Sequence, residues 1–495
     1  MKYFLSAFCI VTSFILSSCS STLKEIPSSA NNSILKTKLY SPDELKSDLD
    51  FLVKTINEVH PKLFKVVDSV AFIDKERKIR SSLTIPISRI ELFKLAAPLL
   101  TMLNDGHSGI YYPEDEWLHY IYNSGRFFPY SITFESTFGL IVRASRDSVN
   151  MLMPGTRILK INGYSADSIF IEFAKYHGAE REDFKFKMVS GIFDVYLWLH
   201  NINPPYEIIC QSKSDQISSF KSEGRVLSFK SSEVIQPAPS FNNYSFEILP
   251  ENIGYLNYRL MRNDKENPFS EFLKNTFSEL KTKHAKGLIV DLRKNGGGNS
   301  DFGKELLKYI TDKPFRTSAK KIWRSSTQYK KYMRKQIPWW AGWATYPPVI
   351  WIAGLFTDET GMFTASDGEC IELIREEEIP GENPLRFNGR VCFLIGPGTF
   401  SAAVDLANAV GDYRLAELIG EETGGIPNSY GEVYNFVLPN TKIEGGISSA
   451  YFVRANGNEK NGHGVLPDIK VRQSAEDMAR NYDTVLEAAK KWILK

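Results

Sequence analysis

The clearest pattern of hydrophobic and polar positions lies at residues 391–405. Val391 to Ile395 are all apolar and predict a buried strand, and the glycines and proline that follow predict a sharp turn. A helix should then begin near Ser401. At a helix start, unpaired N–H groups and the helix dipole favour negative charge, which suits a nucleophile whose reaction creates an oxyanion. Most serines at such positions only cap the helix, so the pattern leaves both interpretations open.

The same layout occurs earlier, at residues 287–310. Gly287 to Leu292 predict a buried strand, residues 293–300 a glycine-rich turn, and the residues up to Ile310 a helix. A strand at 252–260 and an amphipathic helix at about 268–283 should precede them. Repeated strand–turn–helix units indicate a layered α/β domain whose loops gather at one edge. The two glycine turns could therefore face each other across a site.

Helical spacing dominates residues 41–103. Ser41 and Pro42 predict a helix start, and two further helices are expected at about 71–83 and 88–103. The last leads into a glycine-flanked loop that carries Asp105 and His107. A loop histidine is most often simply solvated. A serine hydroxyl nevertheless needs a neighbouring base to take its proton, so His107 is a candidate base for Ser401.

Residues 125–211 are expected to be rich in strands. Within them, Pro154 to Gly163 alternate apolar and polar residues and end in an Asn-Gly turn. This stretch looks like a strand and turn of PDZ domains, which bind peptide ends by adding a strand to a sheet edge. An ordinary β-hairpin is the alternative. Residues 212–240 should add further strands and a linker.

Residues 313–384 have the character of an insertion that is rich in tryptophan, with Trp323 and Trp351 among its members. A satellite hydrophobic core is the default expectation, because aromatic side chains usually bury themselves. The alternative is a cleft wall or lid that contacts apolar side chains of a substrate. Further on, strands are expected near 433–438 and 447–453, and a helix at the end of the chain.

Composition narrows the classes of function. The 495 residues exceed what one core can organise, and 43% hydrophobic residues are typical of globular proteins. Lys+Arg 60 against Asp+Glu 58 gives a net charge of +2, so nucleic acid is not an expected partner. Beyond the first residues, Cys210, Cys370 and Cys392 are too few and too widely spaced for a disulfide framework.

The first residues predict export. Lys2 precedes an apolar stretch that is too short to span a bilayer comfortably. Leu16 to Cys19 resembles the lipobox of bacterial lipoproteins, in which the cysteine becomes the lipid-modified first residue. We therefore expect a signal peptide at 1–19, lipidation of Cys19, a polar tether at 20–40, and folded domains in the periplasm or at the cell surface. A plain secretory signal or a retained membrane anchor are the alternatives.

Several cofactor motifs are incomplete. Gly298 to Lys304 has the glycine spacing of a P-loop, but Glu305 stands where such a loop needs Ser or Thr for Mg²⁺. Gly396 to Gly398 is half of a dinucleotide fingerprint, whose third glycine position is Ser401. The sequence contains no H-E-x-x-H, G-x-S-x-G or paired C-x-x-C motif. We therefore expect no cofactor and no metal.

The order of the remaining motifs resembles that of the S41 family of serine peptidases. This family includes the C-terminal (tail-specific) processing proteases and the tricorn-like enzymes. The similar segments are Gly287 to Gly298 ("N-x-G-G"), Thr399 to Asp405 around the nucleophile, Ile419 to Gly425 ("I-G-x-x-T-x-G"), Gly464 to Asp468 ("G-V-x-P-D"), and upstream Glu58 to Phe64 and Asp105 to Ser108, which look like segments of lipoprotein members.

The resemblance implies a domain organisation. An α/β catalytic domain with a ClpP/crotonase-like fold would occupy 241–495, with an insertion at about 313–384. An N-terminal helical domain would precede it at 41–124, and a small β-rich PDZ-like domain at 125–240.

The resemblance also implies catalytic roles, with Ser401 as nucleophile. Tail-specific proteases use a lysine after "T-x-G" as the base, but Ile426 stands there and cannot accept a proton. Tricorn-like members use a histidine from an upstream domain, which His107 matches. An acid would orient this histidine, and the candidates are Glu459 and Asp105. The N–H groups of Ala402 and Gly297 would hold the oxyanion.

The sequence thus predicts an exported, lipid-anchored serine peptidase that hydrolyses peptide or protein substrates through an acyl-enzyme. The alternative is a lipoprotein of the same fold that binds peptides or small ligands without catalysis. The absent lysine at residue 426 keeps that alternative open, because function depends on the site and not on the fold.

Overall fold

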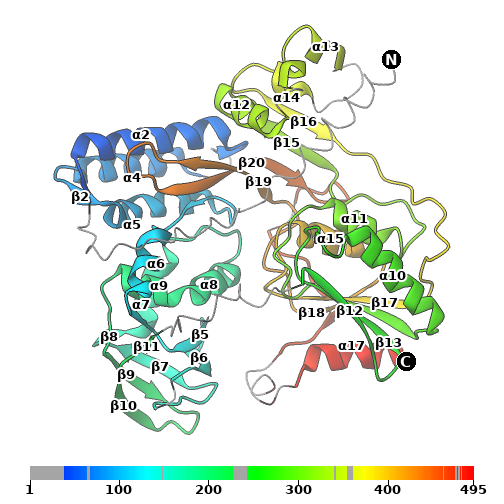
Figure 1. Cartoon of the computed structure of the whole chain (residues 1–495), viewed down its shortest axis with the longest axis horizontal. Coiled ribbons are helices and arrows are strands. Elements are labelled where there is room, and N and C mark those ends of the chain that lie inside the picture. Colours follow the sequence, from blue (N-terminus) through cyan, green and yellow to red (C-terminus); the bar gives the residue numbers. More distant parts are fainter. Residues whose placement is uncertain are drawn as a thin grey trace. The chain divides into compact units, whose positions relative to one another are not determined.

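The computed structural model describes residues 38–495 except 64–66, 148, 227–241, 339–341, 354–359, 461, 474–476, 478–479 and 481. The predicted signal peptide, Cys19 and nearly all of the tether lie outside the described residues. The chain divides into two compact units (Figure 1). The first contains the residues up to Pro113, Ser318–Glu376 and Asn428–Glu459, and the second contains Glu114–Thr317, Glu377–Pro427 and Lys460–Lys495. Across the described ranges, none of the helices has the length and hydrophobicity that crossing a bilayer requires.

The first unit is built around an antiparallel sheet whose strands come from distant parts of the chain. Their order is β16-β15-β20-β19, and the short β3 pairs with the other edge of β20. The strands are β3 (Gly109–Ile110), β15 (Lys320–Arg324), β16 (Cys370–Ile374), β19 (Tyr430–Val437) and β20 (Glu444–Val453). The predicted insertion therefore contributes strands to the same sheet as the segment that follows His107.

Helices and a small strand pair complete the first unit. The helix predicted to start at Ser41 is confirmed, and so are those expected at about 71–83 and 88–103, with small shifts of their ends. The elements are β1 (Leu39–Tyr40), α2 (Pro42–Val59), α4 (Ser69–Ser82), β2 (Ile87–Ser88), α5 (Arg89–Leu100), η1 (Thr101–Leu103), α12 (Thr327–Gln336), η2 (Gly342–Thr345), α13 (Val349–Ala353) and α14 (Gly361–Thr364).

Helix α2 shows how local sequence and long-range contacts combine. Ser41 and Glu44 form a capping box, in which each side chain bonds the other residue's backbone N–H. Further along the helix, the buried carboxylate of Asp48 accepts hydrogen bonds from the backbone N–H groups of Asn440 and Thr441, both at 2.8 Å. These bonds join α2 to the turn between β19 and β20.

The second unit contains the predicted layered α/β arrangement. Its sheet has the order β12-β13-β14-β17-β18-β21, with β12 antiparallel and the other neighbours parallel. Helix α17 packs on one face through a core that includes Ile289, Leu394 and Val485. The strands are β12 (Tyr244–Leu249), β13 (Ile253–Tyr258), β14 (Gly287–Asp291), β17 (Arg390–Ile395), β18 (Glu417–Gly420) and β21 (Ile469–Lys470), and the helices are α10 (Phe269–Thr282), α11 (Asp301–Leu307), α15 (Ala402–Asp412) and α17 (Thr484–Leu494).

A second sheet, of order β10-β9-β7-β6-β5, belongs to the same unit. The predicted Asn-Gly turn is confirmed, since Asn162 and Gly163 both have positive φ, 48° and 81°. The region contains more helix than we expected, because three helices separate β8 from β9. The elements are α6 (Glu114–Tyr122), β4 (Arg126–Phe127), β5 (Tyr130–Glu135), β6 (Gly139–Ser145), β7 (Arg157–Ile161), β8 (Tyr164–Ser165), α7 (Ala166–Ala174), α8 (Glu182–Gly191), α9 (Phe193–Leu199), β9 (Tyr206–Gln211), β10 (Ile217–Ser222) and β11 (Arg225–Val226).

Candidate active site

Ser401 lies between the turn that follows β17 and the first residue of α15. Its φ and ψ of 54° and −132° are unusual for a residue with a side chain, and such conformations cost about 1–3 kcal/mol. Its side chain forms no capping hydrogen bond with α15. The strand, turn and helix that we predicted here are thus confirmed. A serine that served only as a helix cap would bond the first turn with its hydroxyl, so the geometry disfavours that alternative.

The glycine turn after β14 lies directly against Ser401. Gly297 has a φ of 98°, and a Cβ placed on it would lie 2.7 Å from Ser401 Cβ and 2.9 Å from Ala402 N. Only glycine allows this approach. The two turns are also joined by a hydrogen bond, since Phe400 N–H donates to the carbonyl of Asn295 at 3.0 Å. The structure therefore brings together three of the predicted site residues, Ser401, Ala402 and Gly297.

The two predicted oxyanion donors differ in their present contacts. The N–H of Gly297 donates to Asn295 Oδ1 at 2.8 Å. The N–H of Ala402 has no acceptor in the described part of the chain. Ala402 thus offers an open donor beside Ser401, whereas Gly297 would share its hydrogen between Asn295 and an oxyanion.

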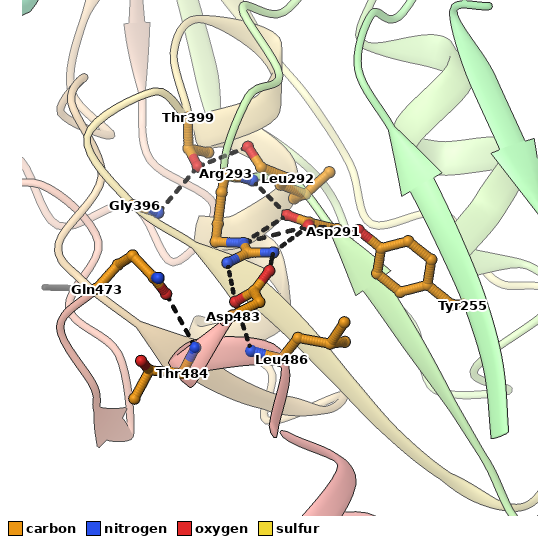
Figure 2. A network of polar contacts seen from close by, with 10 residues as sticks. All are labelled: Tyr255, Asp291, Leu292, Arg293, Gly396, Thr399, Gln473, Asp483, Thr484 and Leu486. Atoms are coloured by element: carbon orange, nitrogen blue, oxygen red, sulfur yellow. Dashed lines mark hydrogen bonds and ion pairs between the residues drawn. The ribbon is translucent and has the colours of Figure 1, made fainter. Parts of the chain in front are cut away.

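A partly buried ion network lies beside both turns (Figure 2). The Arg293 guanidinium bonds Asp291 at the end of β14, Nη2 to Oδ2 at 2.6 Å, and Asp483 at the start of α17, Nη1 to Oδ1 at 2.8 Å. Tyr255 OH donates to Asp291 Oδ2 at 2.8 Å. Burial alone would raise the pKa of Asp483, but the hydrogen bond and charge of Arg293, together with hydrogen bonds from the backbone of α17, lower it. The network fixes the position from which the glycine turn begins.

Thr399 connects the nucleophile turn to its neighbours. Its hydroxyl donates to the carbonyl of Leu292 at 2.8 Å and accepts from Gly396 N–H at 3.2 Å (Figure 2). Its carbonyl accepts from the N–H groups of Gly424 and Gly425 at 3.1 and 3.3 Å. Three of the motif segments therefore meet around one buried threonine.

The segments at 422–425 and 464–465 are themselves paired. Thr423 Oγ1 accepts from Val465 N–H at 2.7 Å, and Glu422 Oε1 accepts from Gly464 N–H at 2.7 Å. Ile426, which follows these contacts, is half-buried and offers no proton acceptor. Cys392 is buried in β17, and burial raises the pKa of its thiol. Neither residue supplies a base or a second nucleophile.

In the first unit, Asp105 organises the loop that carries His107. Its fully buried carboxylate accepts from the backbone N–H of His107 at 2.8 Å and from the hydroxyl of Ser108, and its Oδ1 lies 3.6 Å from His107 Nδ1. Burial would raise the pKa of Asp105, but hydrogen bonding and the charge of His107, together with His60 and Ser108, lower it to about 2. Ser448 N–H donates to Ser108 Oγ at 3.0 Å and so fixes the loop to β20.

Of the two orienting candidates, Asp105 is the one in contact with the His107 loop. Glu459 is exposed and forms ion pairs with Lys62 and Lys320, each at 3.8 Å. In the described residues it has no contact with His107. The structure thus groups the predicted site residues into two sets, with Ser401, Ala402 and Gly297 in the second unit and Asp105, His107 and Glu459 in the first.

Sequence reasoning missed three residues that hold the site. Asn295 bonds both the glycine turn and the nucleophile turn, Arg293 anchors the end of β14, and Thr399 joins three segments. Asn295 and Thr399 lie within the motif segments that we matched, so their importance could have been predicted from the sequence. One of the two partners of Arg293, Asp483, is far away along the chain and could not be predicted from the sequence.

His60, at the end of α2, is a buried histidine whose pKa is affected by Asp105 of the His107 loop. It is fully buried, its ring lies 4.6 Å from that of Tyr430, and neither ring nitrogen has a hydrogen-bond partner in the described residues. Burial lowers the pKa of His60 to about 4, although the charge of Asp105 acts in the opposite direction. The folded protein therefore holds His60 neutral at pH values where an unfolded chain would protonate it.

His60→Phe should make the protein less sensitive to acid. Because the pKa of His60 falls from an ordinary 6.5 to about 4 on folding, the unfolded state takes up a proton first, and stability is lost as the pH falls through this range. The difference between the two pKa values corresponds to about 3 kcal/mol in the free energy of unfolding, at about 1.4 kcal/mol per pKa unit. Thermal unfolding between pH 7.5 and 4.5 measures it, with the exposed His284→Asn as control. An unchanged pH dependence in His60→Phe would contradict this account.

Comparison with known proteins places these observations in a family. Residues 252–471 match the family model described as peptidase family S41. This range includes the glycine turn, the nucleophile turn and the two segments around Thr423. No curated protein sequence matches the chain significantly.

Solved structures of similar fold cover most of the chain. Mature CPAF in complex with lactacystin is 15% identical, with a TM-score of 0.60 over 91% of this chain and 98% of that chain. Mature CPAF alone is 14% identical, with a TM-score of 0.60 over 91% and 96%. A putative peptidase from Parabacteroides merdae is 16% identical, with a TM-score of 0.44 over 92% and 98%. The similarity to CPAF confirms the predicted fold class, a ClpP/crotonase-like α/β fold with additional domains. Over residues 252–471, the chain is thus similar to peptidase family S41, as the order of the motifs predicted, and this similarity supports a serine-type peptidase.

Proposed function

We propose that this peptidase is an exported, lipid-anchored enzyme that hydrolyses peptide bonds through an acyl-enzyme formed on Ser401. The observation that carries the proposal is the strained backbone of Ser401, held against Gly297 at a helix start. Strain of this kind persists where the surrounding structure requires one conformation, and it is concentrated at active sites. The open N–H of Ala402 lies next to the hydroxyl that would attack.

In the proposed reaction, His107 takes the proton of Ser401 Oγ while the oxygen attacks the carbonyl carbon of the peptide. Ala402 and Gly297 hold the resulting oxyanion. His107 then gives the proton to the leaving amine, and water hydrolyses the acyl-enzyme by the same route. Asp105 would fix the orientation of the imidazole and stabilise its positive charge. Support for His107 comes from its motif, from Asp105 beside it, and from Ile426, which leaves no lysine base at the position used by tail-specific relatives.

Reactivity toward a fluorophosphonate probe tests the proposed pair. The wild-type protein should be labelled at Ser401, Ser401→Ala should abolish labelling, and His107→Ala should slow it by roughly 10³-fold or more, because an unassisted hydroxyl is a weak nucleophile. Ser300→Ala is the matched control, since Ser300 precedes α11 as Ser401 precedes α15. Absence of labelling in a folded wild-type protein would favour the non-catalytic binding protein.

The glycine turn provides a second test. In Gly297→Ala the new Cβ would meet Ser401 Cβ at 2.7 Å and Ala402 N at 2.9 Å, and the residue would keep an unfavourable positive φ. Labelling of Ser401 should fall by at least about 100-fold, the scale of losing one oxyanion donor. Gly296→Ala is the control, because a Cβ there meets nothing within 4 Å. If the two variants were labelled equally and both had normal melting curves, Gly297 would have no role in the reaction.

Membrane attachment rests on the sequence of residues 1–19. Acyl chains on Cys19 would hold the folded domains at a bacterial membrane while leaving them in the aqueous phase. Expressed in a bacterial host, the wild-type protein should incorporate radiolabelled palmitate and sediment with membranes. Cys19→Ser should lose the label and stay unprocessed, whereas Cys9→Ser should behave like wild type. Label in Cys19→Ser would refute lipidation at this residue.

A further inference from the structure

Helix α8 is fixed beside the site by two independent contacts, one with the nucleophile turn and one with the segment at 422–425. The rings of Phe184 and Phe400 stack with centroids 4.1 Å apart and an interplanar angle of 10°. Arg181, just before the helix, forms an ion pair with Glu422, whose Oε1 also accepts from Gly464 N–H at 2.7 Å. The helix therefore holds its side chains at defined positions beside the residues that precede Ser401.

Lys187 of α8 also reaches this turn. Its Nζ lies against Gly398, so closely that a Cβ on Gly398 would collide with it. The side chain stays accessible to solvent. Within the described part of the chain, Lys187 has neither an ion-pair partner nor a hydrogen-bond partner. An ammonium held in place without an anion is an unsatisfied charge-assisted donor.

Two further cations lie near this ammonium. Arg143 on β6 and Lys294 in the glycine turn are both exposed. The pKa of Lys187 is lowered, first because the protein around the ammonium displaces water, and then because the charges of Arg143 and Lys294 repel its proton. The carboxylate one turn earlier on α8, Asp183, is bonded to Arg181 and does not neutralise the group. Three segments of the chain thus place positive charge together.

We propose that Lys187, Arg143 and Lys294 form a subsite that binds a carboxylate of the peptide substrate next to the nucleophile turn. The inference rests on the proposed peptidase function, which makes the ligand a peptide. The anionic groups of a peptide are the side chains of Asp and Glu and the C-terminal carboxylate. Charge complementarity favours any of these over a neutral or basic residue at this position. Lys187 determines specificity here and takes no part in proton transfer.

Competition with fluorophosphonate labelling of Ser401 tests this subsite. The probes are random heptapeptide mixtures with one fixed Glu or one fixed Gln, each prepared with a free C-terminus and as a C-terminal amide. Carboxylate-bearing mixtures should protect Ser401 about five- to tenfold better than the neutral ones, which is the scale of about 1 kcal/mol. The Glu–Gln comparison and the acid–amide comparison identify which carboxylate binds.

Two variants distinguish binding at the subsite from a general effect of positive charge on α8. In Lys187→Met the preference for carboxylate should disappear, with each degree of protection expressed relative to the labelling rate of that variant without competitor. Lys185→Met, on the same helix, should retain the preference. The inference is overturned if no preference exists in the wild type or if Lys187→Met keeps it. Absence of labelling would instead be a failure of the proposed function, and binding of the same mixtures, measured by equilibrium dialysis, would then decide the subsite alone.

Discussion

The contact between two turns is the constraint on which the catalytic half of the molecule depends. Gly297 must approach Ser401 and Ala402 to within the distance that only a missing side chain allows. The bond from Phe400 N–H to Asn295 holds the two turns at that distance. Both turns follow parallel neighbours in one sheet, β14 and β17, whose register brings the strand ends to the same edge. The sheet therefore sets the distance between the two turns of the site.

Beneath that edge, an ion network adds to the apolar packing of α17 on the sheet. The Arg293 guanidinium satisfies two carboxylates, one at the end of β14 and one at the start of α17. Removing either carboxylate would leave the partly buried Arg293 charge less well compensated, which costs more than losing a fully exposed ion pair. The network thereby couples the C-terminal helix to the glycine turn, although α17 contributes no residue to the site itself.

The sequence predicted those parts of the structure that depend on local rules. Helix α2 follows from its capping box, β17 from an unbroken apolar run, and the Asn162–Gly163 turn from residues that tolerate positive φ. Pairings over long distances could not be predicted. β15 and β20 are neighbours in one sheet, and Asp48 bonds Thr441, yet nothing in the local sequence of either partner identifies the other. Helices α7 to α9 were missed because their region was interpreted through the strands that flank it.

The same limit applies to the site. Ser401, Gly297 and Ala402 were accessible to sequence reasoning because they stand in glycine-rich turns beside predicted elements. Lys187 was not, because it lies on an unpredicted helix and its place beside Gly398 is a product of tertiary packing.

The position of Lys187 also distinguishes two roles that a lysine can have near a serine nucleophile. A lysine base must be neutral when it acts and must lie within hydrogen-bond reach of the hydroxyl. In the described residues no hydrogen bond joins Lys187 to Ser401, so Lys187 does not meet the second condition. Its neighbours Arg143 and Lys294 lower its pKa, yet a bound carboxylate would reverse that effect, because an opposite charge favours the protonated form. A peptide carboxylate would thus supply the anion that the Lys187 ammonium lacks among the described residues. Proton transfer is left to a histidine, while positive charge beside the nucleophile serves to select the peptide.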